Sequence, residues 1–317
     1  KLDPEKIPNV SLQGFSGINN AAYPGSWHDF VFVWSDNVTK ITGNHTFKAG
    51  ISIERSGMDD QIQLSFAQAP ATTNQNGAFR FFNNRAGGAD YSAANALLGL
   101  FDDYTEFGAK PDTHWIAMGY DAFLQDSWRV TPDVTLELGL RYSYWQPWHE
   151  DNNELASFNS AFYDPARAVT VDPRGGFITG GDLFNGIVIP RDGPDRETLA
   201  KFPHLADLPG LYRGAPAGFA ETPKDGVQPR LGLAYAINED TTFRTGVGLF
   251  LNRVQINTTA AYGFNPPLSD MATVTNGNVD APGGAARRTF PFVMAMHSPE
   301  FTNPRSWAWQ ATVDRNL

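Results

Sequence analysis

Two neighbouring runs of alternating residues, between positions 115 and 145, restrict the possible folds of this chain more than any other feature. In both runs apolar residues occupy every second position, and small, polar or charged residues fill most of the positions between them. A side-chain period of two predicts β-strands. Thr131-Pro132-Asp133 separates the runs and predicts a chain reversal. The two strands would form a hairpin, each strand about a dozen residues long, which is roughly twice the length usual in soluble domains.

One face of this predicted hairpin is apolar and the other carries glycine, serine and charged groups. A strand that crosses a membrane as part of a barrel has this pattern, because lipid lies on one side and a polar lumen on the other. A long hairpin of a soluble β-sandwich would also have one apolar face. This hairpin alone therefore leaves both classes of fold open.

The same design recurs twice, which favours the membrane barrel. Residues 230–251 alternate around a turn at Asn238-Glu239-Asp240, and residues 30–54 alternate around a turn at Thr42-Gly43-Asn44-His45. Glycine and charge again gather on one face, and glycine on that face indicates crowding or sharp barrel curvature. The side chains expected to face lipid are Leu136, Leu138, Leu140, Leu231, Leu233, Val247 and Leu249. Those expected to face the lumen are Glu137, Arg141, Arg230 and Arg244.

The connections between the hairpins are much longer than the turns within them. Residues 146–226 contain ten Gly and nine Pro and have no clear period, and residues 252–304 form a second long connection. Compact domains rarely carry irregular loops of this length. Outer-membrane barrels do, because they combine short periplasmic turns with long extracellular loops. Both connections are therefore predicted to be extracellular loops, irregular apart from short ordered pieces around Arg196 to Phe202. Residues 146–226 are predicted to be the recognition surface, and a passive lid is the alternative.

Composition agrees with this all-β prediction and excludes other classes. The net charge of −10 argues against a nucleic-acid partner. No run approaches the ~20 apolar residues that a membrane-spanning helix needs, so a helical membrane protein is excluded. The chain has no Cys, and none of its His residues is paired at a metal-ligand spacing. We expect no enzyme activity, no metal and no cofactor.

Several segments carry a resemblance to a known family. Residues 125–142, from Gln125-Asp126-Ser127-Trp128 to Leu140-Arg141-Tyr142, resemble the barrel hairpin of TonB-dependent outer-membrane transporters. Three further segments resemble the Oar-like group of these receptors and occur in a similar order along the chain. They are Gly43-Asn44-His45-Thr46-Phe47, Pro229-Arg230-Leu231-Gly232 and Arg244-Thr245-Gly246-Val247-Gly248. The resemblance covers nearly the whole chain from about Ile7.

This resemblance implies a larger protein with a signal peptide, an N-terminal domain, a plug and a barrel of 22 strands. The chain shows none of the first three and about ten predicted strands, so residues 1–317 are expected to be part of one barrel domain. The implied partners are outer-membrane lipid, an extracellular ligand and the TonB complex, which would act through the N-terminal part. The ten predicted strands are 7–15, 27–41, 46–66, 77–83, 101–109, 114–129, 133–145, 227–238, 241–251 and 305–315.

Aromatic residues near the predicted strand ends have two interpretations. Indole and phenol rings settle at the level of the lipid headgroups, so they can form a girdle. Aromatic residues that face an outer loop can instead form a platform for a ligand. The residues expected to contact a ligand are Trp145, Trp148, Tyr163 and Tyr212.

The resulting functional hypothesis is a receptor in the outer membrane of a Gram-negative bacterium that takes up a ligand with energy from the inner membrane. The alternative is a structural or adhesive surface protein whose loops bind a partner while nothing crosses the membrane. A plug and a TonB-binding segment would distinguish the two.

Overall fold

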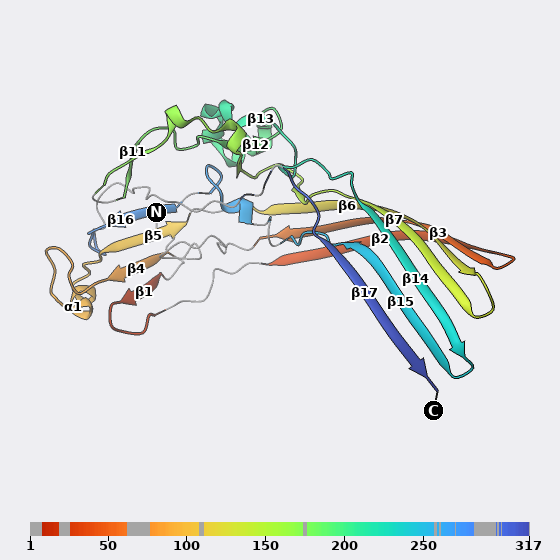
Figure 1. The fold of residues 1–317 in the computed structure, drawn as a ribbon. Coiled ribbons are helices and arrows are strands. Elements are labelled where there is room, and N and C mark those ends of the chain that lie inside the picture. Colours follow the sequence, from red (N-terminus) through yellow and green to blue (C-terminus); the bar gives the residue numbers. More distant parts are fainter. Residues whose placement is uncertain are drawn as a thin grey trace.

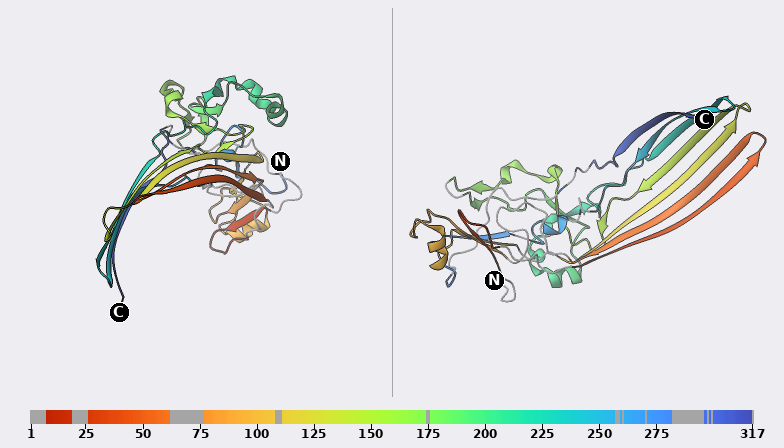
Figure 2. Two further views of the ribbon diagram at one scale, coloured as in Figure 1. Left: turned by 90° about the vertical axis from the view of Figure 1, so that its right-hand side faces the viewer. Right: turned by 90° about the horizontal axis from the view of Figure 1, so that it is seen from below.

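The structure is a computed structural model that describes residues 8–18, 26–61, 77–107, 111–173, 176–256, 259, 261–269, 271–281, 296, 298 and 300–316. The molecule is elongated: a sheet of long strands occupies one end, and short strands and helices occupy the other (Figure 1). Figure 2 shows that the long strands form a strongly curved sheet. Among the described residues, no helix is long and apolar enough to cross a membrane.

The large sheet has seven long strands in the order β17-β15-β14-β7-β6-β3-β2, and every neighbouring pair is antiparallel. A short strand, β8 (His149–Glu150), pairs with the outer part of β6. The observed bounds follow the predicted ones closely. The seven strands are β2 (Trp27–Thr42), β3 (His45–Asp60), β6 (Thr113–Arg129), β7 (Val134–Trp145), β14 (Val227–Asn238), β15 (Thr241–Leu251) and β17 (Arg305–Arg315).

Short turns join these strands at one end of the sheet (Figure 1). In the turn between β6 and β7, the hydroxyl of Thr131 accepts a hydrogen bond from the backbone N–H of Val134 at 3.1 Å. The turn between β2 and β3 uses Gly43 in a left-handed conformation, with φ of 56°. Local side-chain acceptors and a glycine therefore close these hairpins without long loops, and the predicted separation of short turns from long connections is confirmed.

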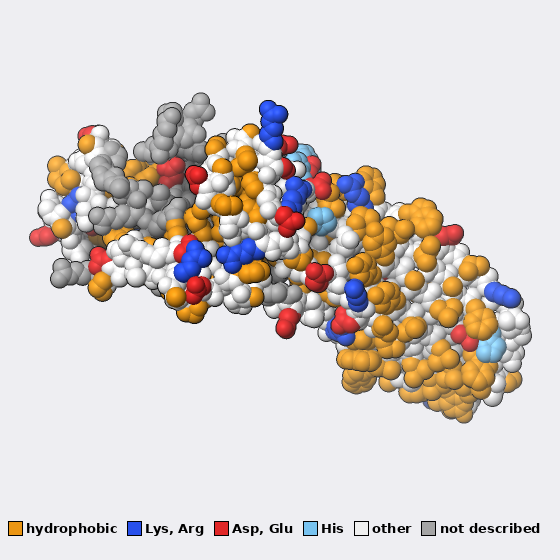
Figure 3. All heavy atoms as spheres, turned by 90° about the horizontal axis from the view of Figure 1, so that it is seen from above, with side chains coloured by type: hydrophobic (Ala, Val, Ile, Leu, Met, Phe, Trp, Pro, Cys, Tyr) orange, Lys and Arg blue, Asp and Glu red, His pale blue; other side chains and the backbone are white. Residues whose placement is uncertain are grey.

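The two faces of the sheet follow from the register, because directly opposed residues in an antiparallel pair share a face. Leu138 opposes Leu231, and Leu231 opposes Val247 on its other side. The apolar face therefore runs as continuous rows across the strands, and Figure 3 shows hydrophobic side chains gathered over this end of the molecule. Leu140 and Leu231 are about half exposed, at 52% and 50%.

All seven residues expected to face lipid lie on this apolar face, as do the aromatic residues of β17. Leu249 differs from the others in exposure, since it is only 8% exposed. Glu137, Arg141, Arg230 and Arg244 lie on the opposite, polar face; the register places Glu137 against Gly232, and Arg230 against Gly139 and Gly248.

Glycine on the polar face has a steric cause. A Cβ on Gly50 would lie 2.6 Å from the ring of Phe123 on the neighbouring strand and 2.9 Å from the carbonyl oxygen of Asp36. At this position a side chain and a backbone oxygen of the adjacent strands lie so close that only a residue without a Cβ fits.

Three of the ten strands predicted for the barrel do not belong to the large sheet. The short segments predicted at 7–15, 77–83 and 101–109 form a separate four-stranded sheet with a strand from the second long connection. β1 pairs with β4 in parallel, which is possible because the whole β2–β3 hairpin lies between them in sequence. The four strands are β1 (Asn9–Leu12), β4 (Ala78–Phe81), β5 (Asp103–Phe107) and β16 (Met271–Thr275). Residues 7, 62–66 and 108–109 of the predicted strands lie outside the described residues.

This small sheet has its own apolar core, so its strands pack together without pairing to the large sheet. Phe79, Phe81, Phe101 and Tyr104 are buried together, and the helix α1 (Ser92–Leu97) supplies Ala96 to the same core. The helix lies where Ala and Leu residues between Tyr91 and Leu98 predict it.

The prediction that 146–226 is irregular is wrong for much of the segment, although the ordered piece expected around Arg196 to Phe202 is present as the helix α2 (Arg196–Lys201). The segment contains a three-stranded sheet in the order β13-β12-β9 and a two-stranded sheet, β10-β11. Its elements are β9 (Ser157–Phe158), η1 (Ser160–Phe162), η2 (Pro165–Arg167), β10 (Thr170–Val171), β11 (Ile178–Gly180), β12 (Ile187–Pro190), α2 (Arg196–Lys201), η3 (Pro203–Asp207), η4 (Pro209–Leu211) and β13 (Tyr212–Ala215). Within the second connection, η5 (Ala261–Phe264) precedes β16.

The two faces of the large sheet should differ in their tolerance of a charge. Arg in place of Leu138, on the apolar face, should hinder membrane insertion by roughly 2 to 4 kcal/mol if the position lies near the bilayer midplane. Arg in place of the adjacent Glu137, on the polar face, should leave insertion nearly unchanged. A quantitative membrane-assembly assay on the two variants measures the difference, and equal tolerance would contradict the assignment of the faces.

Candidate functional site

The two long connections fold together over the outer ends of β3 and β6. We call the described part of residues 146–226 and 252–269 the loop assembly. Its first core contains Leu155, Val188, Phe219 and Tyr262, which pack against Met58 of β3 and Trp115 of β6. Trp115 is 1% exposed, so it is a core residue and not part of a girdle at the membrane surface. The large sheet and the loop assembly therefore share one core.

A buried carboxyl group lies at this junction. Glu150 is fully buried, and its side chain accepts hydrogen bonds from the backbone N–H groups of Glu154, at 2.8 Å, and His114, at 3.2 Å. Burial raises the pKa of the Glu150 carboxyl. Glu154 is also buried and pairs with Lys201 of α2 at 3.0 Å. These contacts fix the start of the first connection against β6.

The two connections are also tied directly to each other. The side-chain amide of Asn265 donates to the carbonyl oxygen of Ala156 at 2.6 Å, and the indole of Trp148 donates to the carbonyl oxygen of Val254 at 3.1 Å. A second core, which includes Ile187, Ile189 and Leu268, again draws on both connections. The loop assembly is thus one packed unit.

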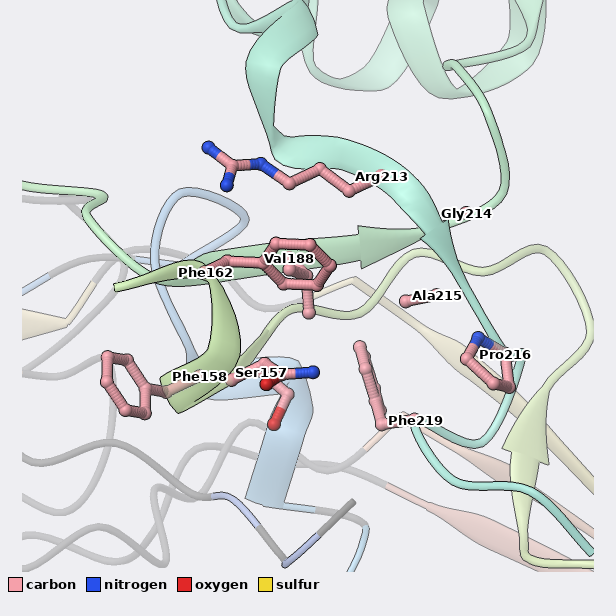
Figure 4. Close-up of a pocket in the computed structure, with 10 residues that line it drawn as sticks. Ser157, Phe158, Phe162, Val188, Arg213, Gly214, Ala215, Pro216 and Phe219 are labelled. Carbon is pink, nitrogen blue, oxygen red and sulfur yellow. The ribbon is translucent and has the colours of Figure 1, made fainter. Parts of the chain in front are cut away.

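This unit contains a cavity of about 160 Å³ between β9, η1, β12 and β13 (Figure 4). Val188 and Phe219 are buried, whereas Phe162 is half-buried and Arg213 is exposed. The cavity is lined by Ser157, Phe158, Asn159, Phe162, Val188, Arg213, Gly214, Ala215, Pro216 and Phe219.

A polar network lies on the polar face of the large sheet, beneath the loop assembly. The carboxylate of Asp121 pairs with Arg141 at 3.1 Å and accepts a hydrogen bond from the hydroxyl of Ser143. The Ser143 oxygen accepts in turn from the side-chain amide of Gln228 at 2.7 Å, and Gln228 accepts from the backbone N–H of Leu251 at 3.1 Å. The network therefore joins β6, β7, β14 and β15.

Arg253 connects this network to the loop assembly. It follows β15, and its guanidinium crosses the polar face to pair with Glu54 of β3 at 2.5 Å. The same guanidinium lies over the ring of Trp145, 5.4 Å from its centroid. Gly119 lies beneath it, where a Cβ would be 2.2 Å from the guanidinium nitrogen. The second connection is thus anchored inside the curve of the sheet, and Gly119 leaves room for that anchor.

The structure does not bring the four predicted ligand contacts together. Trp145 lies on the polar face beneath Arg253, and Trp148 packs against the first core. Tyr212 packs against the second core, where burial raises the pKa of its hydroxyl to about 12. Tyr163 is 43% exposed and contacts the ring of Phe158, which lines the cavity.

The four charged residues expected in the lumen also lie apart on the polar face. Glu137 accepts hydrogen bonds from Ser127, at 2.6 Å, and Gln125, at 3.0 Å. Arg141 belongs to the Asp121 network, Arg230 lies over the ring of Phe250, and Arg244 pairs with Asp314. These contacts stabilise the wall of the sheet.

Comparison with known protein families agrees with this architecture. The profile of the outer membrane beta barrel domain matches residues 2–317. The chain belongs to this family. The barrel domain is accordingly all-β and lies in the outer membrane of a Gram-negative bacterium, as the alternation of its strands predicts. No curated protein matches the sequence.

Sequence reasoning missed Arg213 and Arg253 of this barrel domain. Arg213 follows Tyr212 in a stretch with no period, and Arg253 stands in a predicted loop. Both acquire their surroundings only from tertiary contacts, so no local pattern marks them. The buried run Ile187-Val188-Ile189 was a usable signal for a strand inside the first connection.

Alanine in place of Gly119 should release Arg253 at little cost in stability, because the atom it displaces is the far end of a flexible side chain. We expect trypsin to cleave after Arg253 several-fold faster in this variant than in the wild-type protein. Gly139→Ala is the matched control, since a Cβ on Gly139 would meet the Arg230 Cβ at an ordinary 3.5 Å. Equal cleavage rates in both variants would contradict the anchoring role of Arg253.

Lowering the pH should stabilise the loop assembly through Glu150. Because the pKa of this carboxyl is raised in the folded protein, its stabilising contribution is complete below the pKa of the unfolded chain and is lost as the pH rises through the folded value. Thermal unfolding between about pH 4 and pH 8 should therefore show the wild-type protein losing stability relative to Glu150→Gln as the pH rises. Glu197→Gln, at an exposed position on α2, should not change the pH profile.

Proposed function

We propose that this barrel domain forms part of the wall of a TonB-dependent receptor and that the loop assembly recognises the ligand. In an outer-membrane barrel the apolar face contacts lipid and the polar face lines the lumen. Short turns face the periplasm in such barrels and long connections face the outside. On this orientation the loop assembly is extracellular and covers part of the barrel mouth.

The observation that carries the proposal is the connection between the loop assembly and the polar face. A loop that only adheres to a partner outside the cell needs no contact inside the barrel. Here Arg253 extends from the loop assembly to Glu54 on the inner side of the sheet. Such a contact supports a role in which binding outside is sensed at the lumen.

The proposal implies three partners and a mechanism. Lipid contacts Leu138, Leu231 and the other members of the apolar face, an extracellular ligand contacts the loop assembly, and the TonB complex acts through an N-terminal part that carries a plug. Force from the inner membrane would move the plug and open the lumen to the bound ligand. The sequence resemblance to the Oar-like group of receptors supports this arrangement.

The test is binding of TonB to the full-length protein. Outer-membrane vesicles that contain it should bind the purified periplasmic domain of TonB saturably, whereas vesicles from a strain without the gene should not. A structural or adhesive surface protein would show no difference between the two preparations. That outcome would overturn the transport proposal in favour of adhesion.

A further inference from the structure

We propose that the cavity of the loop assembly binds a carboxylate attached to an apolar ring about the size of benzene. The inference rests on the proposed function in one respect: it names the ligand class of the recognition site proposed above. Three features favour this ligand: the volume of the cavity, the rings that line it and the charge at its mouth.

The volume suits one aromatic ring. The cavity measures about 160 Å³. A cavity of roughly 150 Å³ admits one benzene ring, so this space is large enough for a ring of that size. The interior here is set by Val188 and Phe219, which are 1% and 7% exposed and packed in the first core. The space is thus held open by residues that already have fixed partners.

The lining favours an aromatic ligand over an aliphatic one of equal size. Phe162 and Phe219 present rings from separate segments of the assembly (Figure 4), and Phe158 also lines the cavity. Aromatic pairs prefer offset or edge-on arrangements, and these add to the gain from burial alone. Phe219 is already packed edge-on against Tyr262, which fixes its orientation.

Arg213 supplies the charge. Its guanidinium carbon lies over the Phe162 ring, 5.1 Å from the centroid, and its Nε donates to the carbonyl oxygen of Gly210 at 2.7 Å. In the part of the chain that the structure describes, no carboxylate forms an ion pair with Arg213. A guanidinium held in this way presents its terminal N–H groups as a fork, the geometry that carboxylates accept.

One nearby acidic group makes the charge preference testable. Asp192 lies close to Gly214, the residue after Arg213 in β13. A Cβ placed on Gly214 would be 3.4 Å from the Asp192 carboxylate oxygen. If Asp192 dominated the cavity mouth, a cation on the same ring would bind better than an anion. The side chain that lines the cavity is that of Arg213, so we expect the anion to bind better.

The experiment is equilibrium dialysis of the purified full-length protein in detergent with labelled phenylacetate, phenylacetamide and phenethylamine. Phenylacetate should bind about tenfold more tightly than the neutral amide, as expected for one charge-assisted contact at an exposed position. Phenethylamine should bind more weakly than either. The tripeptide Gly-Gly-Phe distinguishes a peptide carboxyl terminus from a small aromatic acid as the source of this chemistry.

Three variants locate the binding site. Arg213→Gln should weaken phenylacetate about tenfold and leave the amide unchanged. Ala215→Leu, which fills the cavity, should abolish binding of both. Arg196→Gln, on an exposed arginine of α2 that does not line the cavity, is the matched control and should change neither.

Equal affinities for acid and amide, tighter binding of phenethylamine, or full binding in Ala215→Leu would each overturn the inference. Correct folding of each variant is checked independently by the heat-dependent gel mobility of the barrel. Because dialysis does not require TonB, failure here leaves the transport proposal standing. Conversely, binding of phenylacetate without any TonB interaction would support the site and contradict the transport role.

Discussion

The requirement that every backbone N–H and C=O group in lipid be paired within the protein governs this molecule. A sheet meets that requirement only through long, regular ladders between neighbouring strands. The pairing of β3 with β6 is unbroken from His45 to Asp60, and β15 pairs with β17 without a bulge from Thr241 to Leu251. Regular ladders in turn keep the side-chain period at two, so one face stays apolar from edge to edge.

That constraint explains why the long strands could be predicted from sequence. The predicted ranges 227–238 and 241–251 coincide with β14 and β15. Lipid on one face and a polar lumen on the other require apolar and polar residues to alternate along each strand, so the sequence itself shows the period of two. The described strands outside the large sheet are two to five residues long, and most of them pair with segments distant in sequence. For example, the ring centroids of Phe79 and Phe101 lie 5.2 Å apart in a core that no local sequence pattern predicts.

The candidate site was predictable only in its location. Long connections at one end indicated where recognition would occur, and aromatic residues within them indicated apolar area. The composition of 146–226, rich in Gly and Pro, indicated an irregular loop. Ile187, Ile189 and Leu205 instead form a buried core that orders it. The cavity depends on how Phe162, Arg213 and Phe219 meet, and tertiary packing alone decides that.

The strand directions at the two edges of the large sheet have a consequence for any closed wall that contains it. β2 and β17, the edge strands, both run toward the end with the short turns, as the turn contact between Asn316 and Asp240 shows for β17. If the two were joined directly, they would pair in parallel. A cylinder whose strands are all antiparallel must therefore place an odd number of strands between β17 and β2, and this parity gives it an even total.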